Sequence, residues 1–134
     1  MTYRTLLVIK AIVCLVFGAI FLIVPSVLLR ILGATACAAG LFTAREYGAA
    51  MIGTLLLTWF ARRVTANDAK GAILLDLLVY DAIGVVISLA GVLTGVINVL
   101  GWGVVVVYLF FTVGSAYVLV REKPFRTVAA PASP

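Results

Sequence analysis

The sequence contains no histidine, few charged residues and only two cysteines, and each shortage excludes a class of site. Without histidine, neither a histidine-based metal centre nor a Ser-His-Asp triad can form. Cys14 and Cys37 make no metal-binding or redox motif, so we predict no metal ion and no cofactor. Charged residues make up 11% of the 134 residues, against about 25% in a typical soluble domain. The composition therefore argues against a soluble protein.

Long hydrophobic runs dominate the sequence. Hydrophobic residues make up 65% of the chain, and they gather in runs near the ~20 residues that a transmembrane helix needs. The runs cover residues 6–24, 44–62, 73–93 and 96–120. Inside lipid the backbone must satisfy its own hydrogen bonds, which favours helices. The sequence predicts an all-α fold, an integral membrane four-helix bundle in residues 1–123, followed by a disordered tail in residues 124–134.

The connection between the first two predicted spans has helical features of its own. Pro25 ends the first run, because the residue before a proline disfavours the α conformation. Residues 26–33 carry apolar side chains on one side, with Arg30 off that stripe and Gly33 at the end. This pattern predicts a short interfacial helix, with an irregular loop as the alternative. Residues 34–43 fit either an interfacial loop or the first turns of the next span.

The basic residues predict the orientation of the bundle. One end collects eight of them, namely Arg4, Lys10, Arg62, Arg63, Lys70, Arg121, Lys123 and Arg126. The opposite end has only Arg30 and Arg45. Because basic residues concentrate on the cytoplasmic side of membrane proteins, both termini are predicted to be cytoplasmic. The charges flank spans instead of forming a continuous patch, so nucleic acid is not an expected partner.

Two carboxylates in the third run, Asp76 and Asp81, need compensation, since a carboxylate in hydrocarbon costs roughly 2.5–3.5 kcal/mol on insertion scales. Lys10 is expected at a depth similar to that of Asp76, so the two either form an ion pair or Lys10 reaches the membrane surface. No cation is expected at the depth of Asp81. Its carboxyl group either accepts a hydrogen bond from Tyr108 or is protonated. Tyr80 follows Asp76 by one turn and shares its face.

A second polar cluster is expected at the other end of the bundle. Arg45, Glu46 and Tyr47 open the second span, and Asn98 and Arg30 are predicted on the same side. These residues either surround the mouth of a cavity that binds a polar head group or anchor the helices at the interface. In the second case Arg45 neutralises Glu46 locally.

Small residues four apart predict close helix contacts in two of the spans. Such faces let two backbones approach in a membrane, where packing drives association. The pairs are Ala49 with Gly53 in the second span and Gly84 with Ser88 in the third.

A longer pattern carries a resemblance to known proteins. Residues 25–33 (PSVLLRILG) are followed by AREYGA at 44–49, with Gly53 a turn later. This pattern resembles a broad group of uncharacterised bacterial four-span membrane proteins and is distantly similar to the DoxX-like membrane proteins. The resemblance implies a helical bundle in the bacterial inner membrane, in a family linked to redox and stress functions. No catalytic motif of that family maps onto this chain.

Three hypotheses for the function follow. In the first, the protein binds a lipid, a hydrophobic small molecule or a membrane partner. That partner is either another membrane protein or a second copy of this chain. In the second, it is an oligomeric ion or proton channel or a transporter subunit that uses Asp81. In the third, it is a membrane enzyme acting on a lipid-like substrate with Asp76, Asp81 and Glu46 as acid–base groups. The expected depths of Glu46 and Asp76, towards opposite membrane faces, weigh against this last hypothesis.

Overall fold

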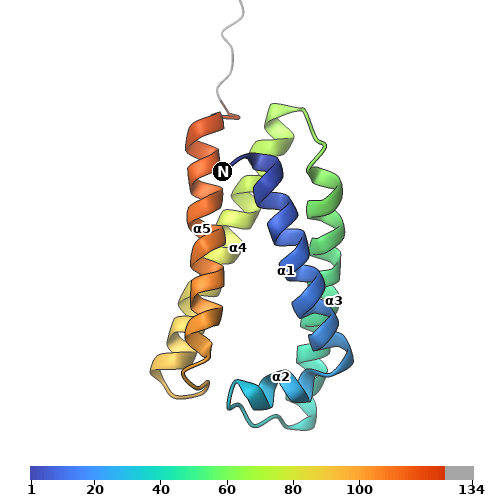
Figure 1. Cartoon of the computed structure of the whole chain (residues 1–134), viewed down its shortest axis with the longest axis vertical. Coiled ribbons are helices and arrows are strands. Elements are labelled where there is room, and N and C mark those ends of the chain that lie inside the picture. The colour runs from blue at the N-terminus through green and yellow to red at the C-terminus, as the bar shows by residue number, and fades with distance from the viewer. Residues whose placement is uncertain (126–134) are drawn as a thin grey trace, which may run out of the picture.

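The computed structural model describes residues 1–125, which form five α-helices and no β-strand (Figure 1). The helices are α1 (Tyr3–Ile23), α2 (Pro25–Ile31), α3 (Ala38–Ala61), α4 (Asn67–Leu93) and α5 (Gly101–Glu122). The four long helices alternate in direction, and α2 lies at the end of the molecule away from the N-terminus (Figure 1). The predicted all-α class is confirmed for this part of the chain. Of the predicted tail, residues 126–134 lie outside the described residues, whereas Pro124 is buried and the Phe125 ring lies against Gly71.

Three of the long helices, α1, α4 and α5, are long and apolar enough to cross a membrane. The 24-residue α3 is not among them, because Arg45, Glu46 and scattered glycines and threonines lower its mean hydropathy. The prediction of four spans is therefore confirmed for three helices. Large hydrophobic side chains such as Ile12, Val86 and Val106 are exposed on all three. A surface this apolar is typical of contact with lipid.

Most helix boundaries differ from the predicted runs by a few residues. Residues 38–43 form the first turns of α3, and the Cys37 sulfur caps this helix by accepting a hydrogen bond from the Gly40 N–H. The predicted helix over residues 26–33 is confirmed as α2, and Gly33 follows it with a left-handed φ of 78°. The α4 helix begins at Asn67, earlier than the predicted residue 73, and α5 begins at Gly101, later than residue 96.

The long helices pack as two antiparallel pairs, α1 with α3 and α4 with α5. Glycines let the first pair approach closely. A Cβ on Gly48 of α3 would lie 2.7 Å from the Leu22 backbone nitrogen and 3.0 Å from the Gly18 carbonyl oxygen of α1. At this crossing the two backbones are in direct contact, so any side chain larger than that of glycine at position 48 would clash with α1.

The second pair uses one of the two predicted small-residue faces. The ring of Tyr108 on α5 covers Gly84 of α4, where a Cβ would lie 2.4 Å from the ring. Ala49 and Gly53 of α3 are both exposed, and a Cβ on Gly53 would meet nothing within 4 Å. This predicted face is therefore left uncovered in the described part of the chain.

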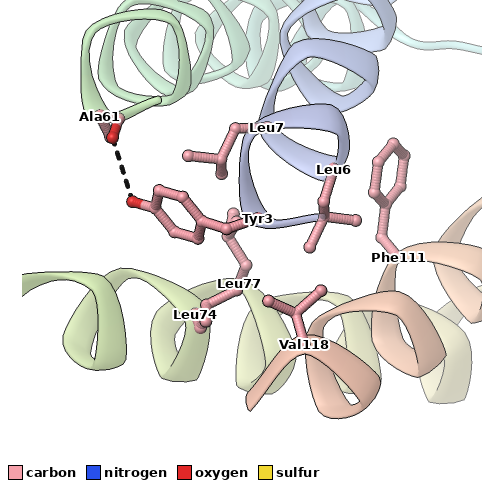
Figure 2. Close-up of a cluster of buried hydrophobic side chains, with 8 residues drawn as sticks. All are labelled: Tyr3, Leu6, Leu7, Ala61, Leu74, Leu77, Phe111 and Val118. Atoms are coloured by element: carbon pink, nitrogen blue, oxygen red, sulfur yellow. Dashed lines mark hydrogen bonds between the residues drawn. The ribbon is translucent and has the colours of Figure 1, made fainter. Parts of the chain in front are cut away.

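The two pairs meet at the end that carries the N-terminus. A cluster of buried side chains from all four long helices fills the space between them (Figure 2). Its members are Tyr3, Leu6, Leu7, Ala61, Leu74, Leu77, Phe111 and Val118. The Tyr3 hydroxyl donates a hydrogen bond of 3.1 Å to the Ala61 carbonyl oxygen, at the end of α3 (Figure 2). Towards α2 the ribbons of the two pairs diverge (Figure 1).

Candidate functional site: a cavity between the helix pairs

A buried ion pair joins the two helix pairs just beyond this cluster. The Lys10 ammonium on α1 contacts the Asp81 carboxylate on α4, and the two side chains are 5% and 0% exposed. The expected pairing of Lys10 with Asp76 is wrong, since Asp76 is exposed and Asp81 holds the lysine. The expectation that no cation reaches the depth of Asp81 is wrong for the same reason. Lys10 also does not belong to the basic flank of the bundle.

The depths of Lys10 and Asp81 in the structure differ from those expected from the predicted starts of the spans. α1 and α4 run in the same direction, so one offset in residue number relates neighbouring positions along both helices. Tyr3 and Leu74 share the buried cluster, and seven residues, or two helical turns, beyond each lie Lys10 and Asp81. Because α4 begins at Asn67, its early turns extend past the start of α1 and shift the register.

Aromatic rings complete the surroundings of the ion pair. The Lys10 nitrogen lies 4.4 Å from the centre of the Phe111 ring and 5.3 Å from the centre of the Tyr80 ring, distances that allow cation–π attraction. The second carboxylate oxygen of Asp81 has no hydrogen-bond partner among residues 1–125. The pair is neutral as a unit, and burial makes each of its charges dependent on the other.

Three tyrosines form a hydrogen-bonded chain beside the ion pair. The Tyr80 hydroxyl on α4 donates to the Tyr47 hydroxyl on α3 over 2.8 Å, and the Tyr47 hydroxyl shares a further hydrogen bond with that of Tyr108 on α5. The expected hydrogen bond from Tyr108 to Asp81 is therefore replaced by one to Tyr47. Sequence reasoning named all three tyrosines as separate candidates. It assigned Tyr47 to the outer end, because the second span was predicted to begin near this residue.

A cavity of about 390 Å³ opens next to these polar groups, between the α1–α3 pair and the α4–α5 pair. Lys10, Tyr47, Tyr80 and Tyr108 contribute to its wall. The remaining lining is almost entirely apolar and comes from α1, α2, α3 and α5, from the residue after α2 and from the residue before α5, so that α4 contributes only Tyr80. This lining consists of Val13, Cys14, Phe17, Phe21, Leu28, Leu32, Met51, Thr54, Leu100, Gly103, Val104, Val107 and Phe111. Sequence reasoning missed these apolar residues, because nothing in a hydrophobic run separates a cavity wall from a lipid-facing surface.

Asn98 connects the α2 segment to the second helix pair, at the end of the cavity away from the ion pair. It lies in the turn between α4 and α5, where its side-chain amide donates to the Ile31 carbonyl oxygen over 2.8 Å. Its backbone N–H donates to the Leu32 carbonyl oxygen over 2.7 Å. These bonds hold α2 against the second helix pair, and Leu28 and Leu32 of the α2 segment thereby line the cavity. Asn98 thus makes a contact between helices, which fits the anchoring alternative of the two predicted for it.

The other predicted site residues are not brought together. Arg30, Arg45, Glu46 and Asp76 are all exposed, and none of them lines the cavity. Among the described residues the Lys10–Asp81 contact is the only ion pair, so the expected neutralisation of Glu46 by Arg45 is not seen. The same residues contain no group of three cysteine or acidic side chains arranged to hold a metal ion.

Comparison of the chain with models of protein families, with curated proteins and with solved structures finds no match. The resemblance to DoxX-like proteins therefore stays a prediction. The function has to be argued from the cavity and its polar groups.

Proposed function

We propose that this chain is a small four-span membrane protein whose central cavity binds a hydrophobic small molecule. The observation that carries the proposal is the cavity of about 390 Å³ between two helix pairs, with apolar walls and a few polar groups gathered on one side. Pockets for small molecules typically measure about 300–1,000 Å³ and combine mostly apolar walls with a few polar groups. The site has both properties.

The proposal treats α3 as the fourth span. Its 24 residues correspond to about 36 Å of helix, enough for the ~30 Å hydrocarbon core. It packs along α1, itself apolar enough to cross a membrane. Trp59 and the stacked Arg62, whose guanidinium lies 3.4 Å from the ring centre, fit an interfacial anchor at its end.

The charges support an orientation with the N-terminus and the end of α5 in the cytoplasm of a bacterial cell. Six basic residues lie near the end of the molecule that carries the N-terminus, namely Arg4, Arg62, Arg63, Lys70, Arg121 and Lys123. Arg30 and Arg45 belong to the segment around α2 and the start of α3 at the other end. This asymmetry follows the positive-inside rule even though Lys10 is buried.

The transport and enzyme hypotheses lose the observations on which they rested. The transport hypothesis took Asp81 as a proton or cation site, and the Lys10 ammonium already contacts that carboxylate. The enzyme hypothesis needed two carboxylates, or one carboxylate and Tyr80 or Tyr108, facing one cavity. Asp76 and Glu46 are exposed outside the cavity, and Asp81 contacts Lys10 and is not among the lining residues. A membrane partner or a second copy of the chain stays a prediction, for which the exposed Ala49–Gly53 face offers close packing.

Two glycines permit a matched test. Gly103 lines the cavity and Gly53 lies on the outer surface of α3, and a Cβ at either position would meet nothing within 4 Å. Both lie in helices, so leucine raises helix propensity equally at each. Only Gly103→Leu places a side chain in the cavity.

The measurement is photolabelling in lipid nanodiscs with a decane chain that carries a diazirine, with the labelled residues mapped by mass spectrometry. We expect label on Met51 and Val104 in the wild-type protein and in Gly53→Leu. We expect Gly103→Leu to lose it while keeping label on the lipid-facing Val106. Label restricted to lipid-facing residues in the wild-type protein would contradict the proposal.

A further inference from the structure

The tyrosine chain has one hydrogen-bond donor left over. Three hydroxyl groups carry three protons, and two hydrogen bonds join them. Tyr80 donates its proton to Tyr47, so the spare proton lies on Tyr47 or on Tyr108, according to which of these two donates to the other. Both tyrosines line the cavity, and neither hydroxyl makes a further hydrogen bond of standard geometry among residues 1–125. Whichever way the chain is oriented, one O–H is available to a ligand.

The charge of the site is already balanced. Among residues 1–125, Lys10 is the only cation in the cavity wall, and it contacts Asp81, whose side chain is fully buried. A second anion in this wall would leave one negative charge without a partner in an apolar environment, which is strongly unfavourable. The site therefore disfavours a carboxylate or a phosphate, although it contains a lysine.

The walls and the volume set the rest of the ligand. The apolar lining extends from the tyrosines to Leu28 and Leu32 at the α2 end, and the volume suits one small molecule or a single short chain. We propose that the cavity binds a neutral amphiphile with one oxygen acceptor, a carbonyl or hydroxyl group, which accepts the spare tyrosine proton while its apolar part lies against the walls. This inference rests on the proposed binding function and names the chemical class of the ligand.

The test compares three photoreactive probes that share one chain length and one diazirine position. The first ends in a methyl ketone, the second in a carboxylate and the third in a methyl group. Each is added to the protein in nanodiscs, and label on Val104 is divided by label on the lipid-facing Val106 of the same helix, which corrects for differences in partitioning. The ketone ratio is expected to exceed the alkane ratio by about threefold to tenfold, the effect of one hydrogen bond. The carboxylate ratio is expected to fall below both.

Variants test the origin of this preference. Tyr117→Phe is the control, because this exposed tyrosine of α5 does not line the cavity, so the change removes a hydroxyl group outside the site. The triple variant Tyr47→Phe, Tyr80→Phe, Tyr108→Phe removes every donor of the chain together. We expect the control to keep the ketone preference and the triple variant to lose it. Removing all partners of a hydrogen-bonded group at once is often nearly neutral for stability.

The outcomes separate this inference from the proposed function. Equal cavity labelling by ketone and alkane would overturn the inference and leave the binding function standing. Strongest labelling by the carboxylate would also overturn it and would identify Lys10 as an anion site. If no probe labels Val104, the proposed binding function itself fails. The comparison of the three probes on wild-type protein holds even if the triple variant does not fold.

Discussion

The interface between the two helix pairs has a packed end and an open end, built by the same four helices. At the packed end, leucines of α1 and α4 interdigitate with Phe111 and Val118 of α5, and the side chains are almost fully buried. At the open end, α5 presents Gly103 and Val104 towards α1, and a cavity takes the place of a core. A hydrophobic run is therefore compatible with both a packed core and an open cavity.

The boundary between these two ends is polar. Lys10 and Asp81 follow the last leucines of the packed cluster, and the tyrosine chain follows them on the cavity side. Hydrogen bonds and ion pairs are directional, so groups that join α1 to α4 and α3 to α5 fix the distance between the pairs at this level. We infer that the boundary keeps the cavity open by preventing the packed end from extending further.

The largest expected effect comes from breaking the boundary. Asp81→Asn leaves the Lys10 ammonium buried without a counter-ion, and loss of one partner of a buried pair costs about 3–5 kcal/mol. We expect the free energy of unfolding, measured by titration with a denaturing detergent in mixed micelles, to fall by about that amount.

Two further variants show whether the pair is the cause. Asp76→Asn, an exposed position on the same helix, is expected to change the free energy of unfolding by less than about 0.5 kcal/mol. The double variant Lys10→Met, Asp81→Leu removes both charges and is expected to recover most of the loss. Equal effects of Asp81→Asn and Asp76→Asn would show that the ion pair does not stabilise the fold.

A smaller effect distinguishes the packed end from the open end. Leu6 is fully buried in the packed cluster, and truncation to alanine leaves a cavity that costs about 2–5 kcal/mol. Val104 already borders a cavity, so Val104→Ala removes fewer contacts, and we expect a loss below about 1 kcal/mol. The same unfolding titration compares the two. Similar losses at both positions would mean that the open end is as tightly packed as the other.

These regions also differ in how well the sequence predicted them. The helices were predictable, because length and hydropathy along residues 6–24 or 73–93 are sufficient to identify a span. The partner of Lys10 was not predictable, because the register between α1 and α4 depends on the residue at which α4 begins. The polar residues 64–70 do not locate that residue to within one helical turn. The contact between Tyr47 and Tyr108 was not predictable for the same reason, because the sequence leaves the relative depth of α3 and α5 open.

The last and smallest difference concerns the two cysteines, one near the polar boundary and one beyond the open end. Cys14 is buried, whereas Cys37 is exposed at the N-cap of α3. Hydrogen bonds from the backbone N–H groups of Gly40 and Ala39 lower the pKa of the Cys37 thiol below its ordinary value. A lowered pKa means more thiolate at a given pH, so the rate of alkylation in purified protein should reach half its maximum at a pH below that value.

The same thiol tests which way the two ends face. In spheroplasts, an impermeant maleimide should label Cys37 from outside, because the packed, basic end is proposed to be cytoplasmic and α1 carries the chain across. A Cys14→Ala background leaves Cys37 as the single site, and Cys37→Ala is the matched control, in which Cys14 should react only after denaturation. Labelling of Cys37 in inverted vesicles but not in spheroplasts would reverse the orientation and place the open end of the cavity towards the cytoplasm.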